Sequence, residues 1–367
     1  MSENTLHQVV KTNTNTHKST TAQTAHKAKC IKLGIDVHAD SYRVVRQLDH
    51  ATPQPAQKFT PKDFLTWAQK QLTQADAVHS CYEAGPLGYS LHRALLAMGI
   101  HNVVIRPQDW DELHKGVKTD KTDALALTQR LDRYVQGNLS ALAVVRVPTP
   151  AQELARSQSR LREQLLAHRL RLEAQGRSLL LFNGVRPRGR WWQERPWKEL
   201  SLRVPATLLE LLSVIHDLLL VVQTQLEKAT ARLEKAAKPQ PVGVGALTSQ
   251  VLEREILSWD RFKNRRQVAS LTGMCPGVRA SGNKQQSGSI TKHGNRRLRT
   301  ALVELAWRWV RFQPEYKPVK RARAVLLSSK SSSAAKKKAI VAVGRHLAID
   351  LWRLNTGRTT PEKLCLR

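Results

Sequence analysis

The chain has 367 residues, and its 60 lysine and arginine residues against 29 aspartate and glutamate residues give a formal charge of +31. That length exceeds what one hydrophobic core usually holds, so we expect at least two domains. The charge exceeds what solubility requires and favours a polyanionic partner, with nucleic acid as the first candidate. The longest apolar run, LLELLSVIHDLLLVV, contains charged residues and is too short to cross a bilayer, which disfavours a membrane protein.

Residues 1–27 form a polar segment rich in Thr, Asn, Lys and His, without the apolar stretch of a signal peptide. We predict a disordered basic tail and a cytoplasmic protein. The four cysteines, Cys30, Cys81, Cys275 and Cys365, are widely scattered and form no Cys-x-x-Cys pair. This spacing disfavours both a zinc knuckle and a disulfide framework.

Residues 28–150 alternate between strand and helix patterns. Two short β-rich runs, 31–36 and 42–48, read as a hairpin, and further strands are expected at 75–81 and 101–106. The segment GYSLHRALLAMG, between the last two, has the spacing of an amphipathic helix. Another helix is expected in GVKTDKTDALALTQRL, and the alternation predicts a compact α/β domain.

Residues 151–238 are predicted to form long helices that build a coiled-coil arm. An a/d heptad seam runs along the second helix, and a weaker one runs along the first. An intramolecular antiparallel hairpin and a dimerisation arm both fit, and we favour a homo-oligomer, either a dimer or a tetramer. The stronger seam consists of Leu208, Leu212, Ile215, Leu219, Val222, Leu226, Ala229 and Leu233.

Residues 239–367 contain three basic amphipathic helix patterns, RFKNRRQVASLTGM, NRRLRTALVELAWRWV and AAKKKAIVAVGRHLAIDLWRL. Their cationic faces predict a mostly α-helical C-terminal domain that contacts nucleic acid.

Four acidic residues occupy notable positions in this basic chain. Asp36 ends one predicted strand, Glu83 directly follows another, and Asp120 and Asp123 lie three residues apart at a predicted helix start. Strand ends are where an α/β sheet presents ligands, and residues three apart share a helix face, so the four carboxylates can converge. The alternative for Asp120 and Asp123 is simple capping of the helix, which needs no chemistry.

Four carboxylates in one cleft repel each other unless a cation is present. An all-oxygen set suits Mg²⁺ or Mn²⁺, and two such ions support in-line displacement at a phosphodiester. Lys118 and Lys121, beside the aspartates, would then help to hold the phosphate backbone.

Five motifs carry a family resemblance: LGIDVHADSYRVV, CYEAGPLGYSLHRAL, GVKTDKTDALAL, RFKNRRQVASLTGMCPGVRASG and GSITKHGNRRLRTAL. In this order the chain resembles, over about residues 30 to 350, the DEDD transposases of bacterial insertion sequences, whose characterised relatives are bridge-RNA-guided recombinases. The resemblance implies an RNase H-like (RuvC-like) N-terminal domain. It also implies that Asp36, Glu83, Asp120 and Asp123 bind Mg²⁺.

The resemblance further implies a serine in the C-terminal domain that attacks DNA, forms a transient phosphoserine link and works with the acidic domain of a partner subunit. Ser281 fits that motif best, and Ser287 and Ser289 are the runners-up. From the residues alone, a Ser and Gly loop most often only makes a turn. Gln286 stands where the family often has a basic residue, which puts one phosphate contact in doubt.

Cations surround this predicted loop and the start of the helix that Asn295 is expected to cap. Arginines in a first helical turn oppose the helix dipole, and a bound phosphate would offset that cost. We therefore predict nucleic-acid contacts at Arg279, Lys284, Lys292, Arg296, Arg297 and Arg299.

The resemblance implies donor and target DNA as substrates and a non-coding guide RNA that selects them. Composition alone indicates only a polyanionic partner. Two other functions stay open at this point: a metal-dependent nuclease or Holliday-junction resolvase that cleaves without joining, and a non-enzymatic nucleic-acid-binding protein whose acids cap helices.

Overall fold

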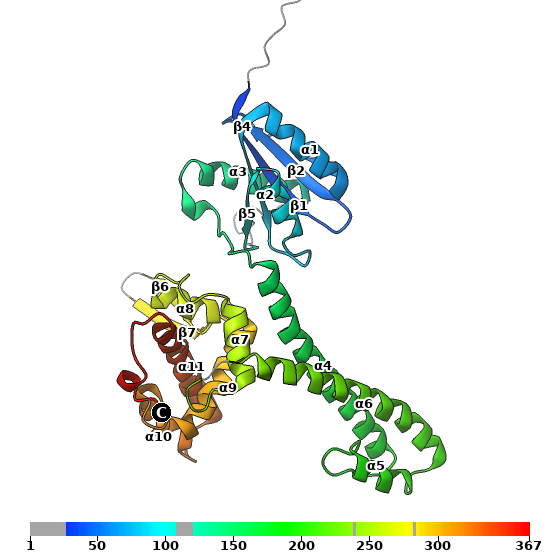
Figure 1. Cartoon of the computed structure of the whole chain (residues 1–367). Helices are drawn as coiled ribbons and strands as arrows, with labels where there is room; N and C mark the ends of the chain where they lie inside the picture. Colours follow the sequence, from blue (N-terminus) through cyan, green and yellow to red (C-terminus); the bar gives the residue numbers. More distant parts are fainter. Residues whose placement is uncertain (1–26, 108–119, 238–239, 282–283) are drawn as a thin grey trace, which may run out of the picture. The chain divides into compact units, whose positions relative to one another are not determined.

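The computed structural model describes residues 27–107, 120–237, 240–281 and 284–367. The chain divides into two compact units, Met1–Val147 and Pro148–Arg367, and each is described by itself (Figure 1). Residues 1–26 of the predicted basic tail and Lys118 lie outside the described residues.

A five-stranded sheet with order β3-β2-β1-β4-β5 forms the centre of the first unit. β1 pairs antiparallel with β2 and parallel with β4, and β5 continues the parallel side. The hairpin and both later strands were predicted, and the mixed α/β architecture is confirmed. The strands are β1 (Ala28–Val37), β2 (Tyr42–Leu48), β3 (Gln57–Phe59), β4 (Ala75–Glu83) and β5 (His101–Ile105), and the helices are α1 (Pro61–Gln74), α2 (Ser90–Ala97) and α3 (Asp120–Val135).

The two faces of this sheet differ in what covers them. Ile31, Leu33 and Ile35 of β1 are fully buried in a core that also contains Phe64 of α1 and Leu95 of α2. The alternate residues of β1 point to the other face, because successive side chains of a strand alternate. There α3 packs over β1, β2 and β4 with its own smaller core.

Two elements of this unit, β3 and α1, were not predicted. The start of α1 nevertheless has a local signal, because Thr60 is its N-cap, accepts a hydrogen bond from Asp63 N and precedes a proline in the first turn.

The second unit begins with a long antiparallel helix pair, α4 (Pro150–Phe182) and α6 (Ala206–Lys235), with α5 (Glu194–Ser201) between them. Arg162 donates to Thr230 Oγ1 and Arg169 to Gln223 Oε1, so early residues of α4 meet late residues of α6. Six residues of the stronger heptad seam are buried on α6, which packs against α4 of the same chain. The seam therefore serves an intramolecular hairpin.

A second apolar stripe on α6 is exposed: Leu211, Val214, Leu218 and Val221. In the described part of the chain α6 is also the one helix long and apolar enough to span a membrane, by length and composition alone. Part of this apolar content belongs to the buried seam, which packs on α4 of the same chain.

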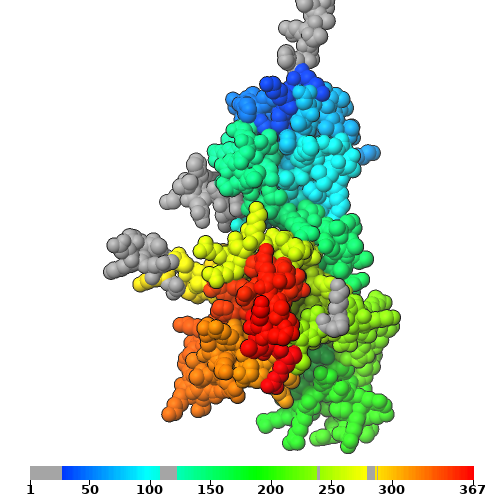
Figure 2. Space-filling view, turned by 60° about the vertical axis from the view of Figure 1, so that its left-hand side comes forward, coloured from blue at the N-terminus to red at the C-terminus, as the bar shows by residue number. Residues whose placement is uncertain are grey.

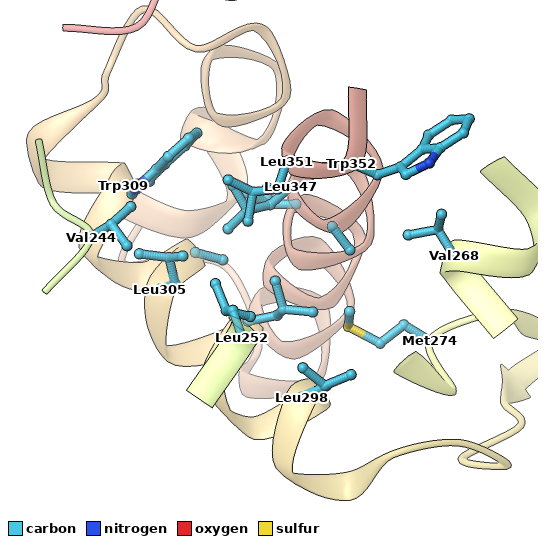
Figure 3. Packing of buried hydrophobic residues seen from close by; sticks show 14 of the residues in the cluster. Val244, Leu252, Val268, Met274, Leu298, Leu305, Trp309, Leu347, Leu351 and Trp352 are labelled. Atoms are coloured by element: carbon cyan, nitrogen blue, oxygen red, sulfur yellow. The ribbon is translucent and has the colours of Figure 1, made fainter. Parts of the chain in front are cut away.

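The rest of the unit is mostly helical and has its own core (Figure 3). Leu347 and Leu351 of one helix lie beside Leu305 and Trp309 of another there, and Trp352 lies on the opposite side of its helix, near Val268. The elements are α7 (Ala246–Ile256), α8 (Arg265–Thr272), β6 (Pro276–Ser281), β7 (Lys284–Ile290), α9 (Arg296–Phe312), α10 (Lys317–Leu327) and α11 (Ser333–Asn355).

The region predicted as a serine loop is a two-stranded antiparallel hairpin, β6 and β7. The loop prediction was wrong because Gly and Ser residues, which usually mark turns, here occupy a ladder held by main-chain pairing. Helix α10 was also missed. The helices α8, α9 and α11 were predicted.

Candidate active site

Two of the predicted acids lie side by side at the ends of parallel strands. The β1–β4 register pairs Gly34 with Cys81 and Ile35 with Tyr82, so Asp36 and Glu83 occupy the next position on each strand. Both acids are two residues beyond Gly34 and Cys81 and therefore share their face of the sheet. Glu83 is half-buried, and the Asp36 side chain is 22% exposed.

Helix α3 lies directly on this face. Gly34 N donates to Thr128 Oγ1 at 3.1 Å, and Cys81 Sγ lies 3.6 Å from Leu127 O. A Cβ atom at Gly34 would stand only 2.5 Å from both Ala124 O and Thr128 N. A glycine is therefore required at this point for the helix to approach the strand.

The direction of α3 follows from two contacts. Lys32 Nζ lies 2.7 Å from Asp132 Oδ1, and two residues along β1 Gly34 meets Thr128, four residues back along α3. Two strand residues advance about 6.7 Å and four helical residues about 6.0 Å, so helix and strand run antiparallel in step. By the same spacing, Asp36, two residues beyond Gly34, lies level with Ala124, four residues before Thr128 near the start of α3.

Asp123 and Asp120 thus lie on the part of α3 that reaches the ends of β1 and β4. Asp123 is half-buried and immediately precedes the fully buried Ala124. Asp120 is the first residue of α3, and its side chain lies outside the described part of the structure. The fold therefore brings Asp36, Glu83 and Asp123 to one edge, with the main chain of Asp120 one helical turn away.

Two further polar residues border Asp36 and were missed by sequence reasoning. His38 Nε2 lies 3.1 Å from Asp36 Oδ2, and Arg43 stands opposite Asp36 in the β1–β2 register. His38 is two residues from Asp36, so a period-two reading of IDVH was the signal that could have found it. Arg43 has no local signal, because strand register is set by pairing.

The donor set at this edge has the chemistry of a hard-cation site. Carboxylate oxygens are ligands that Mg²⁺ and Mn²⁺ prefer. Within the described residues no group of three or more His, Cys, Asp or Glu is close enough to hold a metal ion, and the Asp120 carboxylate is not among those residues. Asp36, Glu83 and Asp123 are the described acids at this edge, and they are not gathered closely enough to hold a metal ion by themselves.

The opposite end of α3 is fixed by a buried lysine that was also missed. Lys32 is 1% exposed, pairs with Asp132 and donates to the main-chain oxygen of Asp49. Burial raises the pKa of Asp132, but hydrogen bonds from Lys32 and Gln136 outweigh it, and the pKa is lowered overall. This buried ion pair holds α3 in register over β1.

The candidate serines belong to the second unit. Ser281 is the last residue of β6 and pairs with Lys284, the first residue of β7. Ser287 and Ser289 lie within β7. Arg279 is on β6, and its side chain, like those of Ser281, Lys284 and Ser287, is outside the described part.

The predicted cationic contacts whose side chains the structure describes divide into exposed and internally bonded residues. Lys292 and Arg296 are exposed. Arg297 Nε lies 2.6 Å from Glu163 Oε2, and Arg299 donates to the main-chain oxygens of Thr272 and Lys292. Asn295 caps α9 as predicted. Lys121 lies in the first turn of α3.

A buried carboxylate secures the base of α9. Glu255 of α7 is 4% exposed and accepts hydrogen bonds from Arg160 and from Asn295 Nδ2, the latter at 2.7 Å. Burial raises the pKa of Glu255, whereas these hydrogen bonds and the charges of Arg160 and Arg156 lower it, and the pKa is lowered overall. Glu255 therefore ties α4, α7 and the N-terminus of α9 together.

Comparison with known proteins gives the family. Residues 241–320 match the model of the transposase IS116/IS110/IS902 family. The chain is 30% identical over 308 residues to y4rJ of Sinorhizobium fredii, named as a transposase, covering 75% of this chain and 76% of that protein. It is 25% identical to the transposase for insertion sequence element IS1533 of Leptospira borgpetersenii, over 76% of this chain and 84% of that protein. It is 26% identical to the transposase for insertion sequence element IS1111A of Coxiella burnetii, over 73% and 75%. The chain belongs to the IS116/IS110/IS902 family of insertion-sequence transposases.

Proposed function

We propose that this transposase cuts and rejoins DNA with two groups of residues, a carboxylate cluster and a serine. The cluster is Asp36, Glu83, Asp120 and Asp123, and the serine is Ser281. One observation carries the proposal: Asp36 and Glu83 end neighbouring parallel strands on one face, and α3 runs antiparallel above them with Asp123 at the same edge.

The carboxylates are proposed to hold Mg²⁺, with Mn²⁺ as the alternative. A bound divalent ion lowers the pKa of a coordinated oxygen nucleophile and neutralises charge on the phosphate. The protein's own contribution is placement. The sheet fixes Asp36 and Glu83, the Lys32–Asp132 pair fixes α3, and His38 orients Asp36 through its 3.1 Å contact.

The serine is proposed to form the covalent link between protein and DNA. Ser281 Oγ attacks phosphorus, the new P–Oγ bond replaces the bond to the departing ribose oxygen, and the Oγ proton leaves to a base. The departing oxygen takes up a proton in turn, so the step needs no other reactant. A serine hydroxyl is a weak nucleophile at neutral pH, which is why it requires the carboxylate cluster as well.

A non-coding guide RNA and a homo-oligomer complete the proposal. The formal charge of +31 supports a large polyanionic complex of DNA and RNA. The exposed stripe of α6, from Leu211 to Val221, supports contact with a second copy, since soluble proteins seldom leave such a row uncovered.

The carboxylate cluster is tested by conservative substitution. Asp36→Asn, Glu83→Gln, Asp120→Asn and Asp123→Asn should each abolish strand exchange while the thermal unfolding midpoint stays close to that of the parent. Asp76→Asn is the matched control, because Asp76 is an exposed carboxylate of the same sheet, paired with Lys27. Chelation by EDTA should abolish strand exchange by the parent protein. Full strand exchange in metal-free buffer would contradict the proposal that a metal ion is required.

The serine is tested by a denaturant-resistant protein–DNA adduct. The parent should form it, Ser281→Ala should lose it, and Ser287→Ala and Ser289→Ala should retain it. If only Ser287→Ala or only Ser289→Ala loses the adduct, that serine of β7 is the nucleophile in place of Ser281. An active reaction in which no protein forms an adduct would favour a hydrolytic nuclease or Holliday-junction resolvase.

A further inference from the structure

A cleft of about 1410 Å³ opens on the second unit. Neither the candidate serines nor the cations predicted to contact nucleic acid line it. Its walls come from the start of α8, from α10 and α11, and from the C-terminal segment. Figure 2 shows the red C-terminal residues on the surface beside the orange region that includes α10. Four chain segments spread over about a hundred residues thus build one concave surface.

This cleft concentrates positive charge. Nine of its lining residues are Lys or Arg, and Asp350 is the one acidic residue in the lining. Asp350 is already engaged, because it accepts a hydrogen bond from Tyr316 Oη at 2.7 Å and pairs with Arg353 at 3.2 Å. In the described part of the chain Arg353 is the one cation of the nine in an ion pair. Like charges gathered without counter-charges favour an anionic ligand.

Buried donors in the wall lack acceptors. Arg345 Nε and Trp352 Nε1 are both buried, and neither has a hydrogen-bond partner among the described residues. Buried polar groups are nearly always hydrogen-bonded, so these two nitrogens are exceptions. Arg345 lines the cleft, and its guanidinium adds a further positive charge to the wall.

The lining favours the nucleic-acid backbone over the bases. Tyr316 and Trp352 in the lining are 0% and 6% exposed, Arg358 lies 4.3 Å above the Trp352 ring, and the one exposed ring in the lining is the imidazole of His346. Single-strand binders instead present aromatic rings on which bases stack. Apart from His346, the exposed lining offers mainly cations and aliphatic groups, which suits a duplex held through its phosphates.

We propose that this cleft binds the sugar–phosphate backbone of double-stranded DNA without regard to sequence. The inference rests on the proposed function, since it assigns the cleft to DNA flanking the reacting strands. It adds a binding surface made by Arg265 of α8, Arg321 of α10 and Lys363 of the C-terminal segment to the contacts predicted around α9.

Removal of three exposed cations from three walls tests the cleft. The triple variant Arg265→Gln/Arg321→Gln/Lys363→Gln is compared with a control that removes three exposed cations of α6, Lys228→Gln/Arg232→Gln/Lys235→Gln. Both sets are made in Asp36→Asn protein, so binding is measured without catalysis. Fluorescence anisotropy with a 30-base-pair duplex, over a salt series, gives the affinity and its salt dependence.

The cleft variant should bind more weakly and with a shallower salt dependence. Three lost phosphate contacts reduce the slope of log K against log salt by about 2.7, which is roughly 500-fold in affinity at about 0.1 M salt. The α6 control should keep the parent slope, two unrelated DNA sequences should give the same loss, and circular dichroism should show equal unfolding midpoints.

Three results would overturn the proposal: equal slopes for the cleft variant and the α6 control, a loss confined to duplex RNA, or a loss confined to one DNA sequence. The proposed function fails separately. If Asp36→Asn abolishes strand exchange while the cleft variant keeps the parent slope, the catalytic assignment stands and the cleft assignment falls.

Discussion

A single methyl group at Gly34 should disable the enzyme by lifting α3 from the sheet. In Gly34→Ala the new Cβ would stand 2.5 Å from Ala124 O and from Thr128 N. Ordinary contacts begin near 3.4 Å, so the helix must move away by about 1 Å. That movement also stretches the 3.1 Å hydrogen bond from Gly34 N to Thr128 Oγ1.

The expected loss of stability follows from three terms. Overpacking destabilises by about 1–3 kcal/mol, and the weakened hydrogen bond adds about 0.5–1.5 kcal/mol. Alanine also lowers the conformational entropy of the unfolded chain relative to glycine, which offsets about 0.4–1 kcal/mol of this loss. The net loss is therefore about 0.5–4 kcal/mol. Activity should fall further than stability, because a misplacement of about 1 Å at a catalytic group can cost about 10²-fold in rate.

Hydrogen exchange read by mass spectrometry should show faster exchange in α3 of Gly34→Ala, and strand exchange should fall in parallel. Gly85→Ala is the matched control, because the nearest atom to its Cβ position is 4.0 Å away. Adding Thr128→Ala should not rescue Gly34→Ala, since main-chain atoms of α3 supply two of the three close contacts. A Gly34→Ala protein with parent exchange rates and activity would refute the close approach.

Three further substitutions test the packing around the site. Lys32→Met removes the buried partner of the partly exposed Asp132 and should destabilise the first unit by about 1.5–3 kcal/mol in urea unfolding at pH 7. Because the folded pKa of Asp132 is lowered, the pair stabilises above the unfolded pKa near 3.9 and is lost as pH falls through the folded pKa. The difference between Lys32→Met and the parent should thus shrink below about pH 4, and a constant difference would exclude the pair as its cause. Glu255→Gln should lower the unfolding free energy by about 3 kcal/mol and speed hydrogen exchange at the start of α9, whereas unchanged exchange there would argue against the anchor. Gly176→Ala would place a Cβ 2.6 Å from Cη2 of Trp191, so tryptophan fluorescence should shift to longer wavelength, and an unshifted spectrum would contradict the packing.

The sequence predicted the parts of the fold that depend on local pattern. The strands of Asp36 and Glu83 were found because short apolar runs between turn residues identify buried strands. The cap at Asn295 was found because capping involves neighbouring residues only. The heptad seam of α6 predicted a buried face, yet such a pattern does not say whether the covering helix belongs to the same chain.

What sequence reasoning missed depends on pairs that are distant along the chain. Lys32 and Asp132 are a hundred residues apart, and nothing near either residue indicates the other. The close approach at Gly34 is likewise visible only once α3 is placed. Ser281 was expected in a loop but ends a β-strand. That strand is held by main-chain hydrogen bonds, and the side chains of a segment rich in Gly and Ser do not indicate such pairing.

The length of α4 has a mechanical consequence. Its 33 residues span about 50 Å, and the part from Arg160, which holds Glu255, to the end of the helix at Phe182 spans about 33 Å. Such a helix acts as a stiff lever with its fulcrum at the base of α9. A rotation of about 5° at Glu255 moves the far end by about 3 Å, so a force applied to the hairpin tip is transmitted as a torque to the start of α9.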